Sequence, residues 1–372
     1  MTGGRDVAVT ARVGIALGIT VAVCFVTGLL SHAIAHPPPW FGWPVAPVWL
    51  YRFTQGLHVA CGIAAIPLVV VKLWSVWPKL FERSRSRGRL GVLVRLLERG
   101  SILVLMAAIL FELSTGLLNI AQWYVFGFYF PPVHYAMAYV AAGAVLVHLA
   151  VKLPVIRRAL GESVDEDGGA GYARTGPSRR TVLRGTWLAV AVATVATVGQ
   201  TVPLLRRVSV LAPRSGEGPQ GVPVNRTALA AGVVTTASAS DYRLTVVDGS
   251  RARTFTLDEL RAMPQTTQHL PIACVEGWSA GAQWSGVVLA DLLAAVGADT
   301  DSDVRMVSLE PPGPYSRTVL PARHVRDART LVALRINGET LNLDHGYPCR
   351  LIAASRPGVL QTKWLSRIEV LR

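Results

Sequence analysis

HLPIACVEGWSAGAQW, residues 269–284, places one of only four cysteines between a short apolar run and the sequence Glu-Gly-Trp-Ser. A cysteine in this position could be a metal ligand, a buried structural thiol or one half of a disulfide bond with Cys349. A disulfide needs an oxidising compartment, so the choice between these alternatives depends on the side of a membrane on which Cys274 lies.

The segments on either side of this stretch have the pattern of short strands joined by tight turns. Tyr242 to Val247 is followed by Asp248-Gly249, and Leu331 to Ile336 is followed by Asn337-Gly338. Asp-Gly and Asn-Gly are the strongest short signals for a β-hairpin. The sequence therefore predicts two hairpins at these positions.

Two short helices are predicted between the hairpins. Thr256 and Glu259 have the spacing of a capping box, and Pro264 ends the helix that they begin. Ser285 is predicted to cap the second helix. The apolar face of that helix would carry Leu289, Leu292, Leu293 and Val296. This order of strands and helices predicts an α+β domain of about 130 residues with its own core.

The first half of the chain is too apolar to be exposed to water throughout. Of the 372 residues, 51% are hydrophobic and only 16% are charged. Five apolar stretches each approach the roughly 20 residues that a helix needs to cross a bilayer. They lie near residues 12–33, 55–74, 101–119, 133–153 and 186–204. We therefore expect a multi-domain fold, an all-α bundle of five transmembrane helices followed by the α+β domain.

The distribution of the net charge of +14 predicts how these helices are oriented. Residues 72–100 carry eight Lys or Arg and residues 152–185 carry seven, whereas residues 33–54 carry only Arg52 and residues 120–133 carry none. By the positive-inside rule, both basic segments are expected in the cytoplasm and the C-terminal domain outside it. Because that domain is only mildly basic, nucleic-acid binding is not expected.

The fifth apolar stretch begins with Ser178-Arg179-Arg180-Thr181-Val182-Leu183-Arg184, which is similar to a bacterial twin-arginine export signal. The alternative is that the paired arginines only mark the cytoplasmic end of a helix. Twin-arginine export carries folded proteins, so it would suit a domain that receives a cofactor before it crosses the membrane. The first helix lacks a cleavage pattern before His36 and is predicted to remain as an anchor.

Histidines within the apolar stretches point to a metal cofactor, because an ionisable residue in a bilayer is costly. His134 and His148 lie fourteen residues apart on the predicted fourth helix, a distance of about 21 Å and nearly four whole turns. They therefore share one helix face near opposite membrane surfaces. Such spacing is typical of membrane cytochromes b, in which one helix supplies a ligand to each of two stacked haems.

His58, on the second helix, lies at about the same depth as His134, and the pair is predicted to bind one outer b-type haem. His148 is a further candidate ligand, but Lys72 stands where its partner would be expected. The alternative is that these histidines only form hydrogen bonds between helices. Glu112 is expected either to relay protons to a quinone or to satisfy a neighbouring helix.

Two separated blocks of residues stand out in the second half of the chain. The first is Cys274-Val275-Glu276-Gly277-Trp278-Ser279 with Trp284-x-Gly286 after it. The second is His345-Gly346-Tyr347-Pro348-Cys349-Arg350, followed by Lys363-Trp364-Leu365-Ser366-Arg367-Ile368. Together these blocks resemble the molybdenum-binding domain of the sulfite oxidase family. The resemblance extends over residues 222–372 and is strongest to the bacterial periplasmic subset that includes the catalytic subunit of the methionine sulfoxide reductase.

This resemblance implies that Cys274 is the protein ligand of molybdenum held by molybdopterin, since the metal takes a soft thiolate. The pterin carries a phosphate, which Arg350 and Lys363 are suited to hold. Further cofactor contacts are implied for His345, Gln361, Thr362, Asn225 and Ser308. The set of arginines by which sulfite oxidases grip their anionic substrate is not found, which favours a neutral sulfoxide or N-oxide.

The two modules together predict a multi-pass enzyme of the cell membrane. Electrons would pass between a quinone or quinol, haem b and molybdenum, which would exchange an oxygen atom with a small-molecule acceptor or donor. One alternative is oxidation of sulfite or a related donor. Another is a haem protein whose outer domain only binds and has no catalytic role. Lipid is an expected partner, and nucleic acid is not.

The predicted domain boundaries follow the composition of the chain. They are residues 1–160 for a cytochrome b-like four-helix domain, 161–185 for a cytoplasmic linker, 186–204 for the fifth helix, 205–221 for a second linker and 222–372 for the extracytoplasmic molybdopterin-binding domain.

Overall fold

The computed structural model describes residues 7–80, 89–125, 127–161, 177–213 and 218–372. Contacts between residues divide the chain into two compact units, which we call the helical unit and the sheet unit. The helical unit comprises Met1–Leu30, Leu57–Gly199 and Leu204–Pro213, and the sheet unit comprises Ser31–Gly56, Gln200–Pro203 and Arg214–Arg372. The predicted domain boundaries remain predictions, and most of the predicted linker 161–185 lies outside the described residues.

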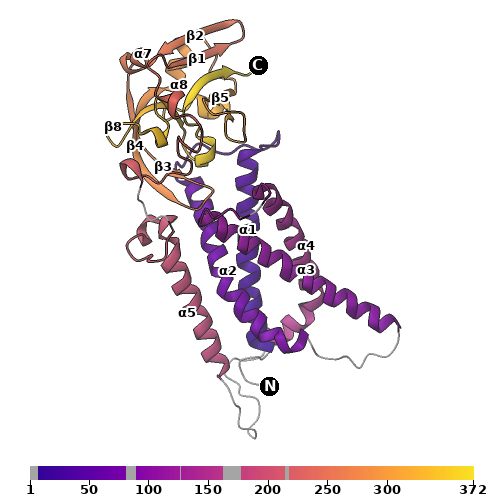
Figure 1. Ribbon diagram of the computed structural model, residues 1–372. Coiled ribbons are helices and arrows are strands. Elements are labelled where there is room, and N and C mark those ends of the chain that lie inside the picture. The colour runs from indigo at the N-terminus through magenta and orange to yellow at the C-terminus, as the bar shows by residue number, and fades with distance from the viewer. Residues whose placement is uncertain (1–6, 81–88, 126, 162–176, 214–217) are drawn as a thin grey trace. The chain divides into compact units, whose positions relative to one another are not determined.

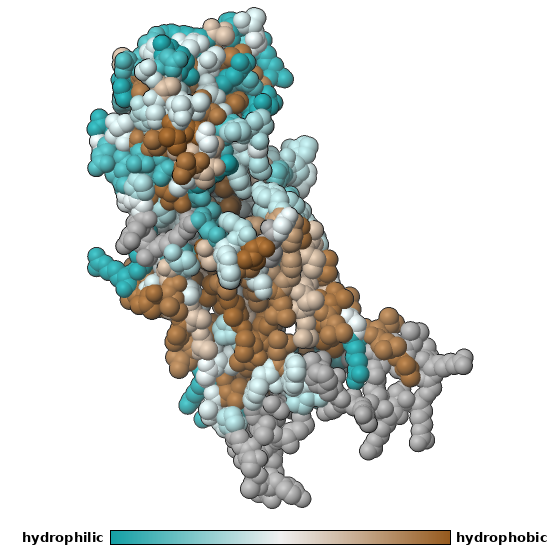
Figure 2. All heavy atoms as spheres, viewed as in Figure 1, coloured by the Kyte–Doolittle hydropathy of each residue, from teal (hydrophilic) through white to brown (hydrophobic). Residues whose placement is uncertain are grey.

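Five long helices account for most of the helical unit (Figure 1). Among the described residues, these five are long and apolar enough to cross a membrane, which confirms the predicted number. Apolar side chains cover their visible face, whereas polar side chains predominate on the sheet unit (Figure 2). The helices are α1 Val7–Ala35, α2 Leu50–Leu80, α3 Arg89–Ile120, α4 Phe130–Gly161 and α5 Arg179–Thr197.

Small side chains lie where the helices of the helical unit pack most closely. Ala108 of α3 and Ala141 of α4 are buried in one apolar cluster with Val69 of α2, and Val21 of α1 packs against it. Without large side chains at these points, helix backbones can approach each other within lipid. The first four helices therefore form one packed bundle.

The predicted export segment forms the first turn of α5. Ser178 is the N-cap residue, and its side chain accepts a hydrogen bond from the backbone N–H of Thr181. Val182 and Leu183 pack against a cluster contributed by α1 and α2. The segment thus has a structural role in starting this helix, and its use in export stays a prediction.

The sheet unit contains two β-sheets of five strands each. One has the order β2-β1-β10-β5-β6, and the other has the order β3-β4-β7-β8 with β9 paired to β7. The strands are β1 Arg243–Asp248, β2 Arg251–Thr256, β3 Thr266–Ala273, β4 Ser279–Val288, β5 Val304–Ser308, β6 Arg317–Leu320, β7 Leu331–Ile336, β8 Glu339–Thr340, β9 Arg350–Ile352 and β10 Leu365–Val370. The short helices are α6 Val234–Ala237, α7 Leu257–Ala262, α8 Leu289–Ala294 and α9 Ala322–Val325.

Both predicted hairpins are confirmed. β1 pairs with β2 through a register that joins Asp248 to Arg251, and β7 pairs with β8 through one that joins Ile336 to Glu339. β1 also pairs in parallel with β10, so the end of the chain lies beside the first strand of the sheet unit. This long-range pairing closes the first sheet around residues that are far apart in sequence.

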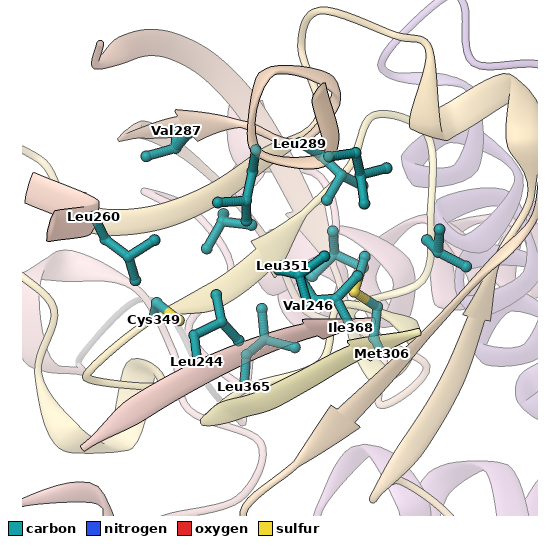
Figure 3. Packing of buried hydrophobic residues seen from close by; sticks show 14 of the residues in the cluster. Leu244, Val246, Leu260, Val287, Leu289, Met306, Cys349, Leu351, Leu365 and Ile368 are labelled. Atoms are coloured by element: carbon teal, nitrogen blue, oxygen red, sulfur yellow. The ribbon is translucent and has the colours of Figure 1, made fainter. Parts of the chain in front are cut away.

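A continuous apolar core is contributed by strands of both sheets and by α7 and α8 (Figure 3). Leu244 of β1, Met306 of β5 and Leu351 of β9 are fully buried within it. Cys349 belongs to the same cluster, and its Sγ lies 3.1 Å from the hydroxyl of Tyr242. None of the four cysteines forms a disulfide in the structure, so Cys274 and Cys349 are not joined.

One predicted helix start is confirmed and the other is wrong. Thr256 and Glu259 form the capping box of α7 with both reciprocal hydrogen bonds. Ser285, in contrast, lies within β4, where its hydroxyl is 2.8 Å from that of Thr267 on β3, and the N-cap residue of α8 is Val288. The polar residue was mistaken for a cap because β4 continues into α8 without a turn. Val296 lies beyond the end of α8, although it still packs against the core.

Shortening a core leucine of α8 should destabilise the sheet unit. Leu292 is fully buried, so Leu292→Ala removes apolar contacts and leaves a cavity, at a cost of about 2–5 kcal/mol. Leu229→Ala, at a side chain that is 81% exposed, serves as the control and should change the free energy of unfolding by less than about 0.5 kcal/mol. Urea unfolding followed by tryptophan fluorescence would measure both, and equal losses would contradict the assigned core.

Candidate functional site

The turn that carries Cys274 joins β3 to β4. The two strands pair up to Ala273 and Ser279, so residues 274–278 form the connection, which we call the Cys274 turn. Its backbone closes on itself, because the N–H of Cys274 donates to the carbonyl of Trp278 at 2.9 Å and the N–H of Gly277 donates to the carbonyl of Cys274 at 3.0 Å. Gly277 has a φ of 89°, a conformation that favours glycine. Cys274 is fully buried.

Cys274 lines a pocket with four other residues that the sequence nominated for the cofactor. The pocket brings together Cys274, His345, Arg350, Lys363 and Asn225. The remaining lining residues are Val222, Pro223, Val224, Ile272, Trp278 and Gly358. Segments that are more than a hundred residues apart in sequence thus meet around one thiol.

Two buried cationic side chains face carbonyl oxygens at this pocket. Arg350 donates to the carbonyls of His345 at 3.0 Å and Gln361 at 3.2 Å. Lys363 donates through Nζ to the carbonyls of Arg226 at 2.5 Å and Asp344 at 2.9 Å. The Nε of Arg350 is buried without a hydrogen-bond partner. These neutral partners orient the two cations but do not neutralise their charge.

No carboxylate within the described ranges forms an ion pair with Arg350 or Lys363. Burial lowers the pKa of Arg350 to about 9. Burial, together with repulsion by Arg350, lowers the pKa of Lys363 to about 7, although the nearby carboxylates of Glu310 and Asp344 act against this shift. A buried positive charge without an ion-pair partner is costly, and an anion would relieve that cost. A soft thiol beside two such cations therefore suits a metal complex that carries a phosphate.

Gly346 allows the two cations to approach each other. Its φ is 105°, and a Cβ added there would lie 3.0 Å from the Cβ of Lys363 and 3.1 Å from the Cβ of Arg350. A contact that short would force one of the two side chains to shift. The glycine in the His345-Gly346 pair is therefore required both by the backbone conformation and by the packing of the pocket.

His345 presents a neutral ring to the pocket. Its Nε2–H donates to the carbonyl of Pro219 at 2.6 Å, because a carbonyl oxygen can only accept. Burial lowers the pKa of His345 to about 4, and the nearby charges of Arg350 and Lys363 act in the same direction. The imidazole is therefore uncharged at neutral pH, with Nδ1 as an acceptor.

Three of the nominated residues support the pocket from behind and are not among its lining residues. Gln361 accepts from Arg350 through its backbone carbonyl and donates its side-chain amide to the carbonyl of Arg356. The hydroxyl of Thr362 is 2.7 Å from that of Thr318 on β6. Ser308 donates to the carbonyl of Lys363 at 2.9 Å and so fixes the backbone that carries the lysine.

Sequence reasoning missed several lining residues. Val222 and Pro223 lie at the start of the stretch that resembles the family, far from its two blocks, and an apolar residue or a proline there carries no chemical signal. Gly358 packs against Ile272 and Ala273, and Pro357 beside it forms a parallel bridge with Ala273. The Pro-Gly pair at this position was the one available signal, since it indicates a turn at which the backbone comes close to another segment.

His58 is held through Nδ1 by two contacts with α1. Its Nδ1 donates to the carbonyl of Cys24 at 3.0 Å and lies 3.1 Å from the hydroxyl of Thr27, both on α1. This bond places the ring proton on Nδ1, which leaves Nε2 as the nitrogen with a free lone pair. Metal-binding histidines are commonly held in this way.

His134 is held similarly but has a carboxyl group at its other nitrogen. The hydroxyl of Thr115 donates to the carbonyl of Phe111 at 2.8 Å and can therefore accept from Nδ1 of His134, which also lies at 2.8 Å. Nε2 of His134 lies 3.1 Å from Oε2 of Glu112. Of the two roles expected for Glu112, the structure displays the contact with a neighbouring helix. Iron could bind His134 only if it displaced this carboxyl group.

His58 and His134 lie near enough to interact electrostatically, so the structure brings the predicted pair together within the helical unit. His148 lies further along α4 and is half-buried. Lys72 donates to the carbonyl of Thr10 on α1 at 2.9 Å, so it links two helices at the position where an inner ligand would be expected.

Residues 231–372 match the family described as "Oxidoreductase molybdopterin binding domain". An alignment of 156 residues is 32% identical to the mitochondrial sulfite oxidase of Drosophila melanogaster and covers 35% of this chain and 27% of that protein. An alignment of 133 residues is 34% identical to the putative protein-methionine-sulfoxide reductase subunit YedZ1 of Azospira oryzae and covers 36% of this chain and 50% of that protein. The matches thus span at most half the length of these relatives.

A solved structure also matches part of the chain. It is the crystal structure of the sulfane dehydrogenase SoxCD from Paracoccus pantotrophus, with a TM-score of 0.32 and 25% sequence identity. The match covers 35% of this chain and 38% of that chain.

The lowered pKa of Lys363 should make the stability of the ligand-free protein depend on pH. Between pH 7 and the ordinary lysine pKa, the unfolded chain holds a proton that the folded chain has lost, so stability rises with pH across this window. In Lys363→Met this contribution is absent, and the melting temperature should rise less between pH 7 and pH 9.5. Differential scanning fluorimetry would measure the slopes, with Lys152→Met on α4 as the control. Parallel curves for wild type and Lys363→Met would contradict the buried charge.

Proposed function

Because residues 231–372 belong to the oxidoreductase molybdopterin-binding domain family, we propose that the chain is a membrane-anchored molybdenum enzyme. It would couple a quinone pool through a b-type haem to the transfer of an oxygen atom. The observation that carries this proposal is the convergence of Cys274, Arg350 and Lys363 on one pocket, as the resemblance required.

The residues of the pocket would each bind a different part of the cofactor. Cys274 would bind molybdenum through its sulfur, and proximity to the metal would keep the thiol deprotonated. Arg350 and Lys363 would hold the phosphate of the pterin, which supplies the anion that their charge lacks. His345 would offer its uncharged Nδ1 to the cofactor as a hydrogen-bond acceptor. When bound, the molybdenum centre would supply two-electron exchange of an oxygen atom with the substrate.

The helical unit would bind one haem between His58 and His134. Hydrogen bonds from Nδ1 of each ring support this assignment, because they leave Nε2 as the nitrogen that could bind iron, in His134 only after Glu112 has been displaced. Glu112 would leave His134 when iron binds and could then accept a proton released by a quinol. His148 is a further candidate ligand, and the engagement of Lys72 with Thr10 argues against a second, matching site.

A neutral sulfoxide-like or N-oxide-like molecule is the proposed substrate. The similarity to a protein named as a methionine-sulfoxide reductase subunit supports this choice, as does the lack of the arginine set that grips sulfite. Oxidation of sulfite or a related donor is the second candidate, favoured by the similarity to sulfite oxidases. A third candidate is a haem protein with a domain that only binds, which would contain haem without stoichiometric molybdenum.

The charge distribution supports an extracytoplasmic location for the catalytic domain. Basic residues gather in the segments 72–100 and 152–185, and by the positive-inside rule the opposite ends of α4 and α5 would lie outside the cytoplasm. The twin-arginine-like segment at the start of α5 would let the domain cross the membrane after it has folded around its cofactor.

Replacing the thiol of Cys274 should abolish the proposed catalysis. Cys274→Ser removes the soft ligand, so quinol-dependent turnover of sulfoxides, N-oxides or sulfite should fall to background while the haem spectrum stays intact. Cys349→Ala, at the other buried thiol of the sheet unit, should keep its molybdenum and its turnover. Metal analysis and a turnover assay with this substrate panel would decide, and turnover retained in Cys274→Ser would refute the mechanism.

Replacement of single histidines should reveal the haem ligands. His58→Ala and His134→Ala should each remove the haem band from reduced-minus-oxidised spectra of the purified protein, because each would delete an axial ligand. His148→Ala should leave the band unchanged. A full band in His134→Ala would contradict the proposed pair, and a band halved by His148→Ala would indicate a second haem instead of one.

A further inference from the structure

The sheet unit incorporates a segment from the first half of the chain. Nε1 of Trp43 is buried and donates to the carbonyl of Ser355 at 2.7 Å and to its hydroxyl at 3.0 Å. Arg329 donates to the carbonyl of Val45 at 3.4 Å. Val48 packs against the apolar cluster that contains Cys274 and Trp278. Residues 43–48 therefore complete the core around the Cys274 turn.

Two side chains from outside residues 231–372 bind backbone carbonyls of the Cys274 turn. The amide Nε2 of Gln55, in the second turn of α2, donates to the carbonyl of Val275 at 3.3 Å. The hydroxyl of Thr201 donates to the carbonyl of Gly277. Gln55 and Thr201 are buried, and both belong to the sheet unit by their contacts. They hold the carbonyl groups of the two residues that flank Glu276.

Tyr51 orients Gln55. Its hydroxyl donates to Oε1 of Gln55 at 3.4 Å and lies 3.2 Å from the hydroxyl of Ser31. Tyr51 is 1% exposed and lies near enough to Cys274 for the two side chains to interact electrostatically. The spacing of four residues puts Tyr51 and Gln55 on one face of α2. The oxygen of the Gln55 amide is thereby occupied, and its nitrogen is directed to the turn.

We propose that Tyr51, Gln55 and Thr201 are positioning residues that fix the Cys274 turn for metal binding. This inference rests on the proposed role of Cys274 as the molybdenum ligand. A turn of five residues with a glycine at positive φ can open locally at little cost unless its carbonyls are held. The two hydrogen bonds limit that opening and so fix the direction in which the sulfur points.

Backbone amide exchange tests the positioning role without any metal. In protein made without molybdate, the double variant Gln55→Leu, Thr201→Val keeps side-chain volume and deletes both donors. Loss of two buried hydrogen bonds should speed exchange of the Cys274 and Gly277 amides about tenfold, since both amides close the turn. Unchanged rates at these amides would overturn the proposal. Faster exchange spread evenly over β1 to β10 would also overturn it, because the effect would then be general destabilisation.

Matched variants distinguish the effect of losing a hydrogen bond from the effect of replacing a side chain. Thr201→Ser keeps the hydroxyl and should exchange as wild type does, whereas Thr201→Val alone should already speed exchange at Gly277. Gln283→Leu makes the same replacement at an exposed residue of β4 and should leave the turn unchanged. Equal exchange in Thr201→Ser and Thr201→Val would contradict the assigned donor.

Electron paramagnetic resonance tests whether the turn sets the geometry of the metal ligand. In molybdenum-loaded protein, the double variant should retain molybdenum but shift the g-values of the Mo(V) signal, because the sulfur would point differently. Identical g-values would overturn the link to the metal. If Cys274→Ser keeps its molybdenum and its turnover, the proposed function fails, whereas the exchange data would still decide whether Gln55 and Thr201 hold the turn.

Discussion

The buried positive charge of Arg350 and Lys363 is the constraint on which the site depends. Both side chains are held by backbone carbonyls, which fix their positions, and neither forms an ion pair with a carboxylate of the described residues. Burial of such a charge is unfavourable, and an anion in the pocket would relieve this cost. Under the proposed function, that anion would be the phosphate of the cofactor.

Strand pairing in the two sheets brings the parts of this site together. Cys274 follows β3, Arg350 begins β9, and both strands belong to the sheet that is built around β4 and β7. Backbone hydrogen bonds from Leu351 to Thr362 and from Leu365 to Cys349 then tie the segment containing Lys363 to β9. The thiol and the two cations thus lie within a strand or within two residues of one, and strand pairing positions the backbone that carries them.

In the helical unit, the number of helices could be predicted from the sequence, but the contacts between helices could not. Five apolar stretches predicted five membrane-spanning helices because length and hydropathy are local properties. The contact between Glu112 and His134 could not be predicted in the same way, since it depends on how α3 and α4 pack. The prediction that Ser285 caps a helix was wrong for a related reason. Its side chain contacts Thr267, which lies on another strand.

The sequence alone determined the five helices, the hairpins at Asp248-Gly249 and Asn337-Gly338, and the two blocks that nominated Cys274, Arg350 and Lys363. Each of these depends on residue type and short spacing, which the printed sequence displays directly. Only the tertiary structure decided that the two cations lack a carboxylate partner within the described residues, and that Gln55 and Thr201 bind the Cys274 turn. Hydrogen bonds between residues 220 and 76 positions apart leave no local pattern, because they exist only once the chain has folded.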